Sequence, residues 1–446
     1  MVRRAPRAAG RGAGGGYRRR VSESSPKPQR AHGDGALAAF GHRDFRLFWL
    51  GALVSNTGGW MQNAAIPYVV FAITGRPGDV GITGFFQYVP FMLMGLVGGT
   101  LADRFPRRSL LIVCQGAQAA CAVALYALVA SGSATTASMS ALSFVAGLAG
   151  GLNTPVWQSF VTELVPRRLL LHAVTLNSAQ FNAARALGPL LAGVVIATWG
   201  AATAFAINAA SFVVVIGVLL VIRGSSDDRP RGQHAGVLAG WKVALRYVVS
   251  TPAILACCTA IIAVAGIGSP LFSYLAVYGE QVFAVDGFRL GLLFGAAGIG
   301  SVLFTPLLLS VVPRLPRATV LGGAMVAYGV ATAAVGAAPG YVAAVIALLF
   351  FGGAYLAIAS TINTAIQLVV EERLRGVVIA VYLMCLTGAL PIGLYLWGVI
   401  SDQVGIRTTT IGAGVLLVIV TLLFIVTRRF SVMAAADDAR DAAAAP

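Results

Sequence analysis

Arg185 has the clearest capacity for chemistry in this sequence, because it lies in the middle of an apolar run, 173–199, that holds no acidic residue. Ser178, Asn182 and Pro189 recur near its face if the run is a helix. A guanidinium on such a polar stripe could hold an anionic or carbonyl oxygen of a bound molecule. The alternative is a structural arginine that bonds to neighbouring backbone or asparagine groups.

Uncharged polar and aromatic residues in three other apolar runs could line the same binding cavity. Their spacing in the first of these runs is i, i+4 and i+7, which places them on one helical face. Such groups suit an amphipathic organic molecule better than a sugar or a bare ion. Each could instead form hydrogen bonds that hold neighbouring helices together. The candidates are Asn56, Trp60 and Asn63 in the first run, Gln87 in the second, and Asn153 and Trp157 in the fourth.

The composition shows which elements must position these residues. The 446 residues are 58% hydrophobic and 11% charged, whereas soluble domains are about 45–50% apolar and about 25% charged. Runs of ~20 apolar residues are long enough to cross a bilayer as helices. We therefore predict an all-α membrane protein with twelve transmembrane helices, at 47–72, 79–102, 109–131, 135–160, 173–199, 201–222, 252–278, 288–311, 319–338, 341–369, 377–401 and 408–427.

The formal charge of +16 reflects membrane topology rather than nucleic-acid binding, because basic residues gather in one terminal tail and in short loops. Their distribution places both termini in the cytoplasm, with Arg76, Arg289 and Arg407 on the outside. The predicted order is a disordered basic tail (1–42), a six-helix half (43–222), a linker (223–250), a second half (251–430) and a disordered tail (431–446). The linker contains a predicted amphipathic surface helix, with Leu238, Trp241, Leu245 and Val248 on its apolar face.

The two halves repeat one another. Gly188, Gly193 and Gly200 match Gly393, Gly398 and Gly405 at a constant spacing, and Arg104-Phe-Pro-Arg107 matches Arg314-Leu-Pro-Arg317. Since six spans separate the copies, both have the same orientation. Two parallel halves related by an axis along the membrane normal are an architecture of transporters.

Several motifs in this frame resemble the major facilitator superfamily of secondary transporters. They are Gly99-Thr-Leu-Ala-Asp103-Arg104-Phe-Pro-Arg107-Arg108 between spans two and three, Phe45-Arg-Leu-Phe-Trp-Leu-Gly51, Trp60-Met-Gln-Asn63 and Leu176-Asn-Ser-Ala-Gln-Phe-Asn-Ala-Ala-Arg185. The family pattern usually has Gly where Pro106 stands. Over roughly 43–430 the chain is similar to the branch that includes enterobactin exporters and macrolide-efflux proteins.

The resemblance implies export of a drug-like, siderophore-like or other secondary-metabolite compound by rocking of the halves. It also implies a cytoplasmic gate formed by Gly99, Asp103, Arg104, Arg107 and Arg108, in which Asp103 faces the start of span eleven near Gly376. The alternative for these charges is a cluster that only fixes topology. Gly188, Pro189 and Gly193 resemble part of a helix-kink motif of exporters, with an ordinary packing kink as the alternative.

We expect neither an enzyme nor a cofactor. The five cysteines lie in apolar runs without metal-site spacing, so no metal site is expected, and His172 with Glu163 near one loop is too little for catalysis. The expected partners are a small-molecule substrate, membrane lipid and, as a candidate coupling ion, the proton. Asp103, Glu163 and Glu280 are the candidate acids for coupling. We expect a monomer in the plasma membrane, with import or facilitated diffusion of a small organic solute as the alternative function.

Overall fold

The computed structural model describes residues 37–222, 245–285, 287–370 and 374–430. Its N-terminal half contains six long helices: α1 (Arg43–Thr74), α2 (Pro77–Arg104), α3 (Arg107–Ala130), α4 (Thr136–Val161), α5 (Leu170–Trp199) and α6 (Ala201–Val221). The C-terminal half contains α8 (Pro252–Ala263), α9 (Leu271–Val277), α10 (Gly287–Val311), α11 (Arg317–Ala337), α12 (Tyr341–Val369), α13 (Arg375–Val404) and α14 (Ile406–Val426).

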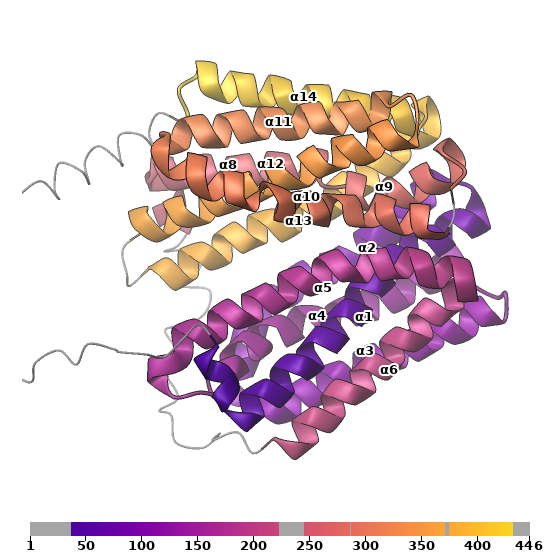
Figure 1. Ribbon diagram of the computed structural model, residues 1–446, viewed down its shortest axis with the longest axis vertical. Coiled ribbons are helices and arrows are strands. Elements are labelled where there is room, and N and C mark those ends of the chain that lie inside the picture. The colour runs from indigo at the N-terminus through magenta and orange to yellow at the C-terminus, as the bar shows by residue number, and fades with distance from the viewer. Residues whose placement is uncertain (1–36, 223–244, 286, 371–373, 431–446) are drawn as a thin grey trace, which may run out of the picture.

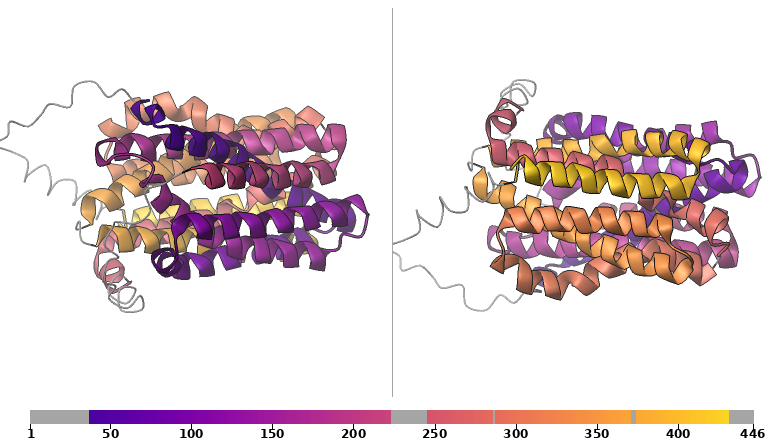
Figure 2. Two further views of the ribbon diagram at one scale, coloured as in Figure 1. Left: turned by 90° about the horizontal axis from the view of Figure 1, so that it is seen from below. Right: turned by 90° about the horizontal axis from the view of Figure 1, so that it is seen from above.

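The two halves lie side by side as separate helical layers, one indigo to pink and one pink to yellow in Figure 1. Their helices run roughly parallel to one common direction, as the two further views in Figure 2 show. The described residues contain no strand. The all-α fold predicted from the sequence is therefore confirmed, with the described helices arranged in two halves.

Nine of the helical segments in the described residues are long and apolar enough on their own to cross a membrane. The segments α1, α2 and α4 are not among these nine, although they pack within the same bundle. These are the helices that carry the candidate polar residues Asn56, Asn63, Gln87 and Asn153. Polar side chains lower the hydropathy of a helix, as in α1, where Asn56 and Asn63 lie.

The seventh predicted span is interrupted, which the sequence analysis did not anticipate. One continuous run, 252–278, was predicted, but α8 and α9 are separated by the π-helical turn Val264–Gly268, and α9 passes into a second one at Tyr278–Val282. Trp397 of α13 donates its indole N–H to the carbonyl oxygen of Ile267 at 2.9 Å. A π turn leaves backbone groups without their usual helical partners, and this bond supplies one partner from another helix.

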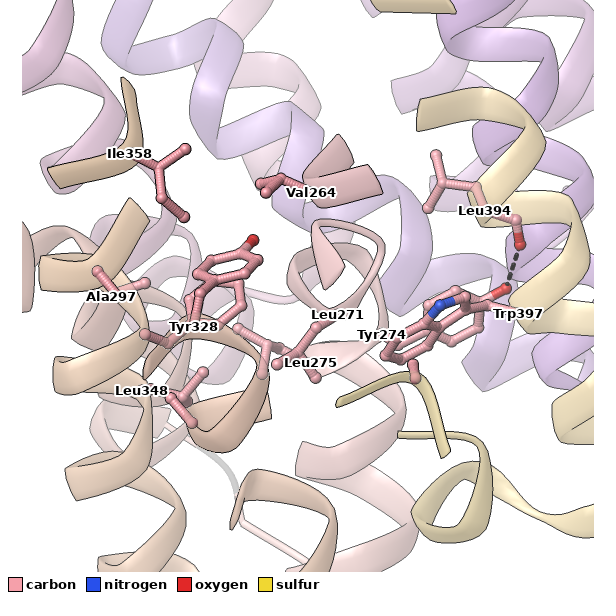
Figure 3. Close-up of a cluster of buried hydrophobic side chains, with 14 of the residues drawn as sticks. Val264, Leu271, Tyr274, Leu275, Ala297, Tyr328, Leu348, Ile358, Leu394 and Trp397 are labelled. Atoms are coloured by element: carbon pink, nitrogen blue, oxygen red, sulfur yellow. Dashed lines mark hydrogen bonds between the residues drawn. The ribbon is translucent and has the colours of Figure 1, made fainter. Parts of the chain in front are cut away.

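A buried cluster of large side chains holds the C-terminal half together around this interruption. Figure 3 shows Tyr274 on α9 next to Trp397, with its hydroxyl directed at the backbone of α13. That hydroxyl donates to the carbonyl oxygen of Leu394 at 2.8 Å. Farther into the half, Tyr328 stacks on Phe351 with 4.3 Å between ring centroids. These contacts tie α9 to α13 and α11 to α12 within the half.

Matching glycines end the fifth and eleventh spans. Gly200 has φ 82° and Gly405 has φ 84°, a left-handed region that favours glycine. Each residue joins a long helix to the next with no intervening loop. The repeat read from the sequence thus marks equivalent turns in the two halves.

Part of the predicted linker helix is described. Residues 245–250 are helical, with Val248 buried and Leu245 exposed. Leu238 and Trp241 lie outside the described residues, as do most of the two predicted tails. The surface location of this helix stays a prediction.

The orientation is tested by labelling single cysteines in a cysteine-free background with a membrane-impermeant maleimide. Ser133 and Pro339 are exposed at the ends of α3 and α11, and the basic-residue bias places both outside. Ser133→Cys and Pro339→Cys should label in intact cells, as should a cysteine at 286. A cysteine at 227 should label only after lysis. The reverse pattern would overturn the predicted orientation.

Candidate functional site

Arg185 lies at the middle of α5, between the two halves. Its guanidinium carbon is 5.7 Å from the ring centroid of Trp60 on α1 and 4.9 Å from that of Tyr355 on α12. Trp60 belongs to the N-terminal half and Tyr355 to the other. Arg185 is nevertheless exposed. An exposed side chain that touches both halves must line an open space between them.

The charge of Arg185 is not balanced by an acidic side chain nearby. Among the described residues, every other charged side chain lies near a helix end or in a loop. Within the same residues, no hydrogen bond or ion pair of Arg185 to the protein is found, and its contacts are the two aromatic rings. Its N–H donors are therefore available to water or to a bound molecule.

The predicted polar stripe on α5 is exposed in the same way. Ser178 donates to the carbonyl oxygen of Val174 at 2.9 Å, and Asn182 donates to that of Ser178 at 2.9 Å. Both bonds stay within α5, so the amide oxygen of Asn182 is left for other partners. Ser178 and Asn182 thus continue from Arg185 toward the predicted cytoplasmic end.

A glycine brings Trp60 to this position. A methyl group added at Gly188 would lie 2.5 Å from Cβ of Trp60 and 2.8 Å from the carbonyl oxygen of Thr57. Only glycine permits α1 and α5 to approach so closely. Trp60 also contacts Phe181 and Phe272, at centroid distances of 6.0 and 6.5 Å, so aromatic rings from α1, α5 and α9 meet beside Arg185.

The opposite wall includes residues that the sequence analysis missed. Tyr355 was not predicted, nor was the exposed polar stripe that follows it on α12. In that stripe Gln367 donates to the amide oxygen of Asn363 at 2.8 Å. The sequence of the run 341–369 already shows these polar residues at i, i+3, i+4 and i+7. This spacing resembles the i, i+4, i+7 pattern from which the first-span candidates were predicted. The stripe consists of Ser360, Asn363, Thr364 and Gln367.

The other predicted polar residues pair with one another inside the N-terminal half. Asn56 donates to Gln180 at 3.2 Å, Gln87 donates to Asn63 at 2.8 Å, and Gln115 donates to Asn153 at 3.3 Å. These bonds join α1 to α5, α1 to α2 and α3 to α4. All three sites are partly buried, so the structure brings these amides together as links between helices. Their contact with substrate stays a prediction.

Trp157 lies in a different place, among the buried residues at the other end of the same half. It is 8% exposed, its ring centroid is 4.3 Å from that of Phe48, and its indole donates to Asn177 at 3.3 Å. The structure does not bring it next to Arg185. Its predicted role in binding is not tested by this geometry.

The predicted cytoplasmic gate is described only in part. The side chains of Gly99, Asp103 and Arg104 lie outside the described residues. Arg107 forms an ion pair with Glu163, which is 8% exposed. Arg108 donates to the carbonyl oxygens of Leu219 and Leu220, in the last turn of α6. These carbonyls have no helical partner, so Arg107 and Arg108 hold α3 against α4 and α6.

The kink residues lie where α5 approaches its neighbours. The helix runs unbroken from Leu170 to Trp199 through the buried Pro189. Gly188 faces α1, whereas Gly193 faces Gly291 of α10 so closely that an added methyl group would overlap the backbone. Gly193 thus forms a backbone contact between the halves at the predicted extracellular end.

A second contact between the halves lies at the same end. Asp402, near the end of α13, accepts a hydrogen bond from the backbone N–H of Gly78 at 2.9 Å and pairs with Arg76 at 3.3 Å. Gly78 is in the first turn of α2, where backbone N–H groups have no helical partner and carry partial positive charge. A methyl group at Gly398 would lie 3.0 Å from Cα of Gly78. We call Asp402, Arg76 and Gly78 the outer contact.

No cluster of three or more potential metal ligands occurs in the described part of the chain. A small cavity of ≈ 210 Å³ lies beside the Gly193–Gly291 contact, with Glu280 at its wall. Its lining comes from both halves: Tyr68, Ile196, Ala197, Glu280, Ala284, Val285 and Leu290. Glu280 remains a candidate for proton coupling.

The comparisons with known proteins agree with this fold. Residues 34–446 match the family model MFS_3, described as "Transmembrane secretion effector". The chain belongs to this family, within the major facilitator superfamily. It is therefore a multi-pass membrane transporter, which confirms the family resemblance predicted from the sequence.

Curated relatives cover most of the chain. It is 26% identical over 376 residues to the multidrug efflux pump Tap of Mycolicibacterium fortuitum, covering 81% of this chain and 90% of the pump. It is 22% identical to the staphyloferrin A transporter of Staphylococcus aureus, covering 85% and 95%. It is 26% identical to the enterobactin exporter EntS of Citrobacter koseri, covering 75% and 80%.

Solved structures show the same fold at low sequence identity. An inward-facing bacterial homologue of the human lysosomal transporter Spinster superposes with a TM-score of 0.70 at 16% identity, covering 88% of this chain and 97% of that one. A D-xylose-proton symporter gives 0.68 at 14% identity, covering 85% and 95%.

Arg185→Ala should weaken binding of a transported compound far more than it lowers stability. The guanidinium gives up two cation–π contacts at an exposed position, worth about 0.5–1 kcal/mol each. Arg185→Lys should restore binding only in part, because the planar fork is lost. Affinity and melting temperature of the purified variants test this. A collapsed melting temperature with unchanged affinity would make Arg185 a structural residue.

Proposed function

We propose that this protein exports small amphipathic organic compounds, such as drugs, siderophores or secondary metabolites, across the plasma membrane by alternating access. The names of its relatives Tap and EntS, a multidrug efflux pump and an enterobactin exporter, support both the substrate class and the direction. The two helical halves supply the architecture that alternating access requires. Both termini then lie in the cytoplasm.

One observation carries the proposal: Arg185 is exposed in the middle of the bundle while it contacts both halves. A charge at bilayer mid-depth has to face the bundle interior or a water-filled space. Polar stripes lead from it along α5 and α12 toward the predicted cytoplasmic end. A compound from that side would reach Arg185 between Trp60 and Tyr355.

In this proposal, the outer contact closes the transporter at its extracellular end. Asp402 and Gly78 belong to different halves, as do Gly193 and Gly291. Both contacts must separate for the compound to leave on the other side. The protein described here is therefore in the state that accepts a compound from the cytoplasm.

The predicted cytoplasmic gate lies at the end of the bundle opposite the outer contact. In the family resemblance, Asp103 near the end of α2 faces the start of α13. Asp402 near the end of α13 faces the start of α2. Because α2 and α13 are antiparallel neighbours, the resemblance implies for Asp103 a position like that of Asp402 at the opposite end of this helix pair. We propose that the outer contact and the cytoplasmic gate close in alternation.

Transport is tested with membrane vesicles of both orientations from cells that express the protein. A panel of anionic, neutral and cationic fluorescent amphiphiles is offered to each. At least one compound should accumulate in inside-out vesicles above the empty-vector control. Accumulation only in right-side-out vesicles would establish import instead. No accumulation of any compound in either orientation would contradict transport.

Asp402→Ala should shift the protein toward the outward-open state. It removes the acceptor for Gly78, a capping bond worth roughly 0.5–2 kcal/mol, which corresponds to about a 2–30-fold change in the ratio of states. Asp402→Asn should shift it less, because an amide oxygen still accepts that bond. Arg76→Ala should have little effect, since the Arg76 side chain is 70% exposed.

The readout is the labelling rate of Asn182→Cys from outside intact cells, in a cysteine-free background. Asp402→Ala should raise this rate most, and Asp103→Asn should lower it while expression stays normal. Equal rates in the Asp402→Ala protein and its parent would show that the outer contact does not hold the outside closed.

A further inference from the structure

We propose that the Arg185 site selects compounds that carry a carboxylate or similar oxyanion next to an aromatic ring, and that it discriminates against cations. This inference rests on the proposed function, because it takes Arg185 to lie in the substrate path. It goes further by naming the charge and shape of the ligand and the residues that impose them.

The first step concerns charge. Arg185 is the one charged side chain in the central part of any described helix, and the acidic side chains of the described residues lie near helix ends or in loops. An anion that reaches mid-depth therefore meets a single positive charge. A cation meets the same charge and no acid. Arginine cannot lose its proton in a protein, so the sign of the site is fixed.

The second step concerns the aromatic side chains. A ring face attracts cations, and aromatic cages of this kind commonly receive cationic ligands. Here the faces of Trp60 and Tyr355 already have a cation close by, the guanidinium of Arg185. The cage is thus occupied by the protein's own charge. A cationic compound would have to displace Arg185 or remain beside it.

The third step concerns shape. Two further phenyl rings, those of Phe181 and Phe272, lie 6.0 and 6.5 Å from Trp60. They offer edges and faces to a flat apolar group. A planar carboxylate matches the fork of N–H donors on arginine in a bidentate way. An aromatic acid would fill both parts of the site at once.

Water limits the size of the effect. Arg185 is exposed in this state, so water screens its charge and competes for its donors. We therefore expect about a tenfold preference for an anion over a neutral analogue, not a much larger one. The preference should grow when the halves close around the compound and water leaves.

The test uses three probes with one ring system: 2-naphthoate, 2-naphthamide and 2-naphthylmethylammonium. Equilibrium dialysis against the purified full-length protein gives the three affinities. The carboxylate should bind about tenfold tighter than the amide, and the ammonium should bind weakest. Failure of the carboxylate to bind, or equal affinity for all three probes, would overturn the inference.

Arg185→Gln gives the sharper outcome, because it should invert the ranking. The carboxylate loses its partner, while the rings of Trp60 and Tyr355 become free for the ammonium probe. The affinity for the carboxylate should fall about tenfold and that for the ammonium should rise several-fold. A ranking that persists in Arg185→Gln would show that another group sets the preference.

Two controls separate this inference from other causes. Arg289→Gln removes the same charge at an exposed position near the start of α10, far along the bundle from Arg185, and should leave the ranking unchanged. If Arg185→Gln does not fold, Arg185→Lys should keep the order of the probes with a smaller spread, and a lost order would contradict the inference. If vesicles accumulate compounds regardless of charge, export stands and the charge selection falls.

Discussion

The cost of a charge in a low-dielectric interior is the constraint on which the rest of this structure depends. A charged side chain at the centre of a membrane helix costs at least ~2.5 kcal/mol unless it reaches water or a partner. Several inner amides of the N-terminal half pair across helices, as Asn63 and Gln87 do. Arg185 has no such amide partner among the described residues, and the rings of Trp60 and Tyr355 lie beside its guanidinium. The space between the halves has to stay wet or filled because of this one residue.

The seal at the predicted extracellular end has a different physical character. It relies on close backbone approach, as at Gly193 and Gly291, and on one carboxylate at a helix start. Helices in a membrane gain nothing from hydrophobic association, so small residues that permit close contact decide where they meet. The Arg76–Asp402 ion pair adds little to this contact, because the Arg76 side chain is 70% exposed. A transporter that must open here with each cycle needs a seal of this kind.

The sequence was sufficient to predict the helical fold and to single out Arg185 as a candidate residue. It was not sufficient to predict which side chains contact Arg185. The length of the apolar runs predicts the helices. A charged residue inside such a run, with no acidic residue in the same run, can be recognised from the sequence alone. Tyr355 was missed because a tyrosine in an apolar run carries no such signal, and its role appears only when α12 lies opposite α5. The π turns in the seventh span were missed because they keep the helical hydropathy pattern, although Gly266, Gly268 and Pro270 hinted at a break. The contact of Asp402 with Gly78 was missed because the two residues are more than three hundred positions apart in the chain.

Arg185 and Gly193 lie on the same helix, so α5 contributes both to the central site and to the contact at the predicted extracellular end. They are eight positions apart on α5, roughly 12 Å along the helix axis at 1.5 Å per residue. α5 is continuous between them although it contains Pro189, so Arg185 and the Gly193–Gly291 contact are positioned by the same helix. A compound that pulls Arg185 and Tyr355 together would draw α5 and α12 inward at mid-depth.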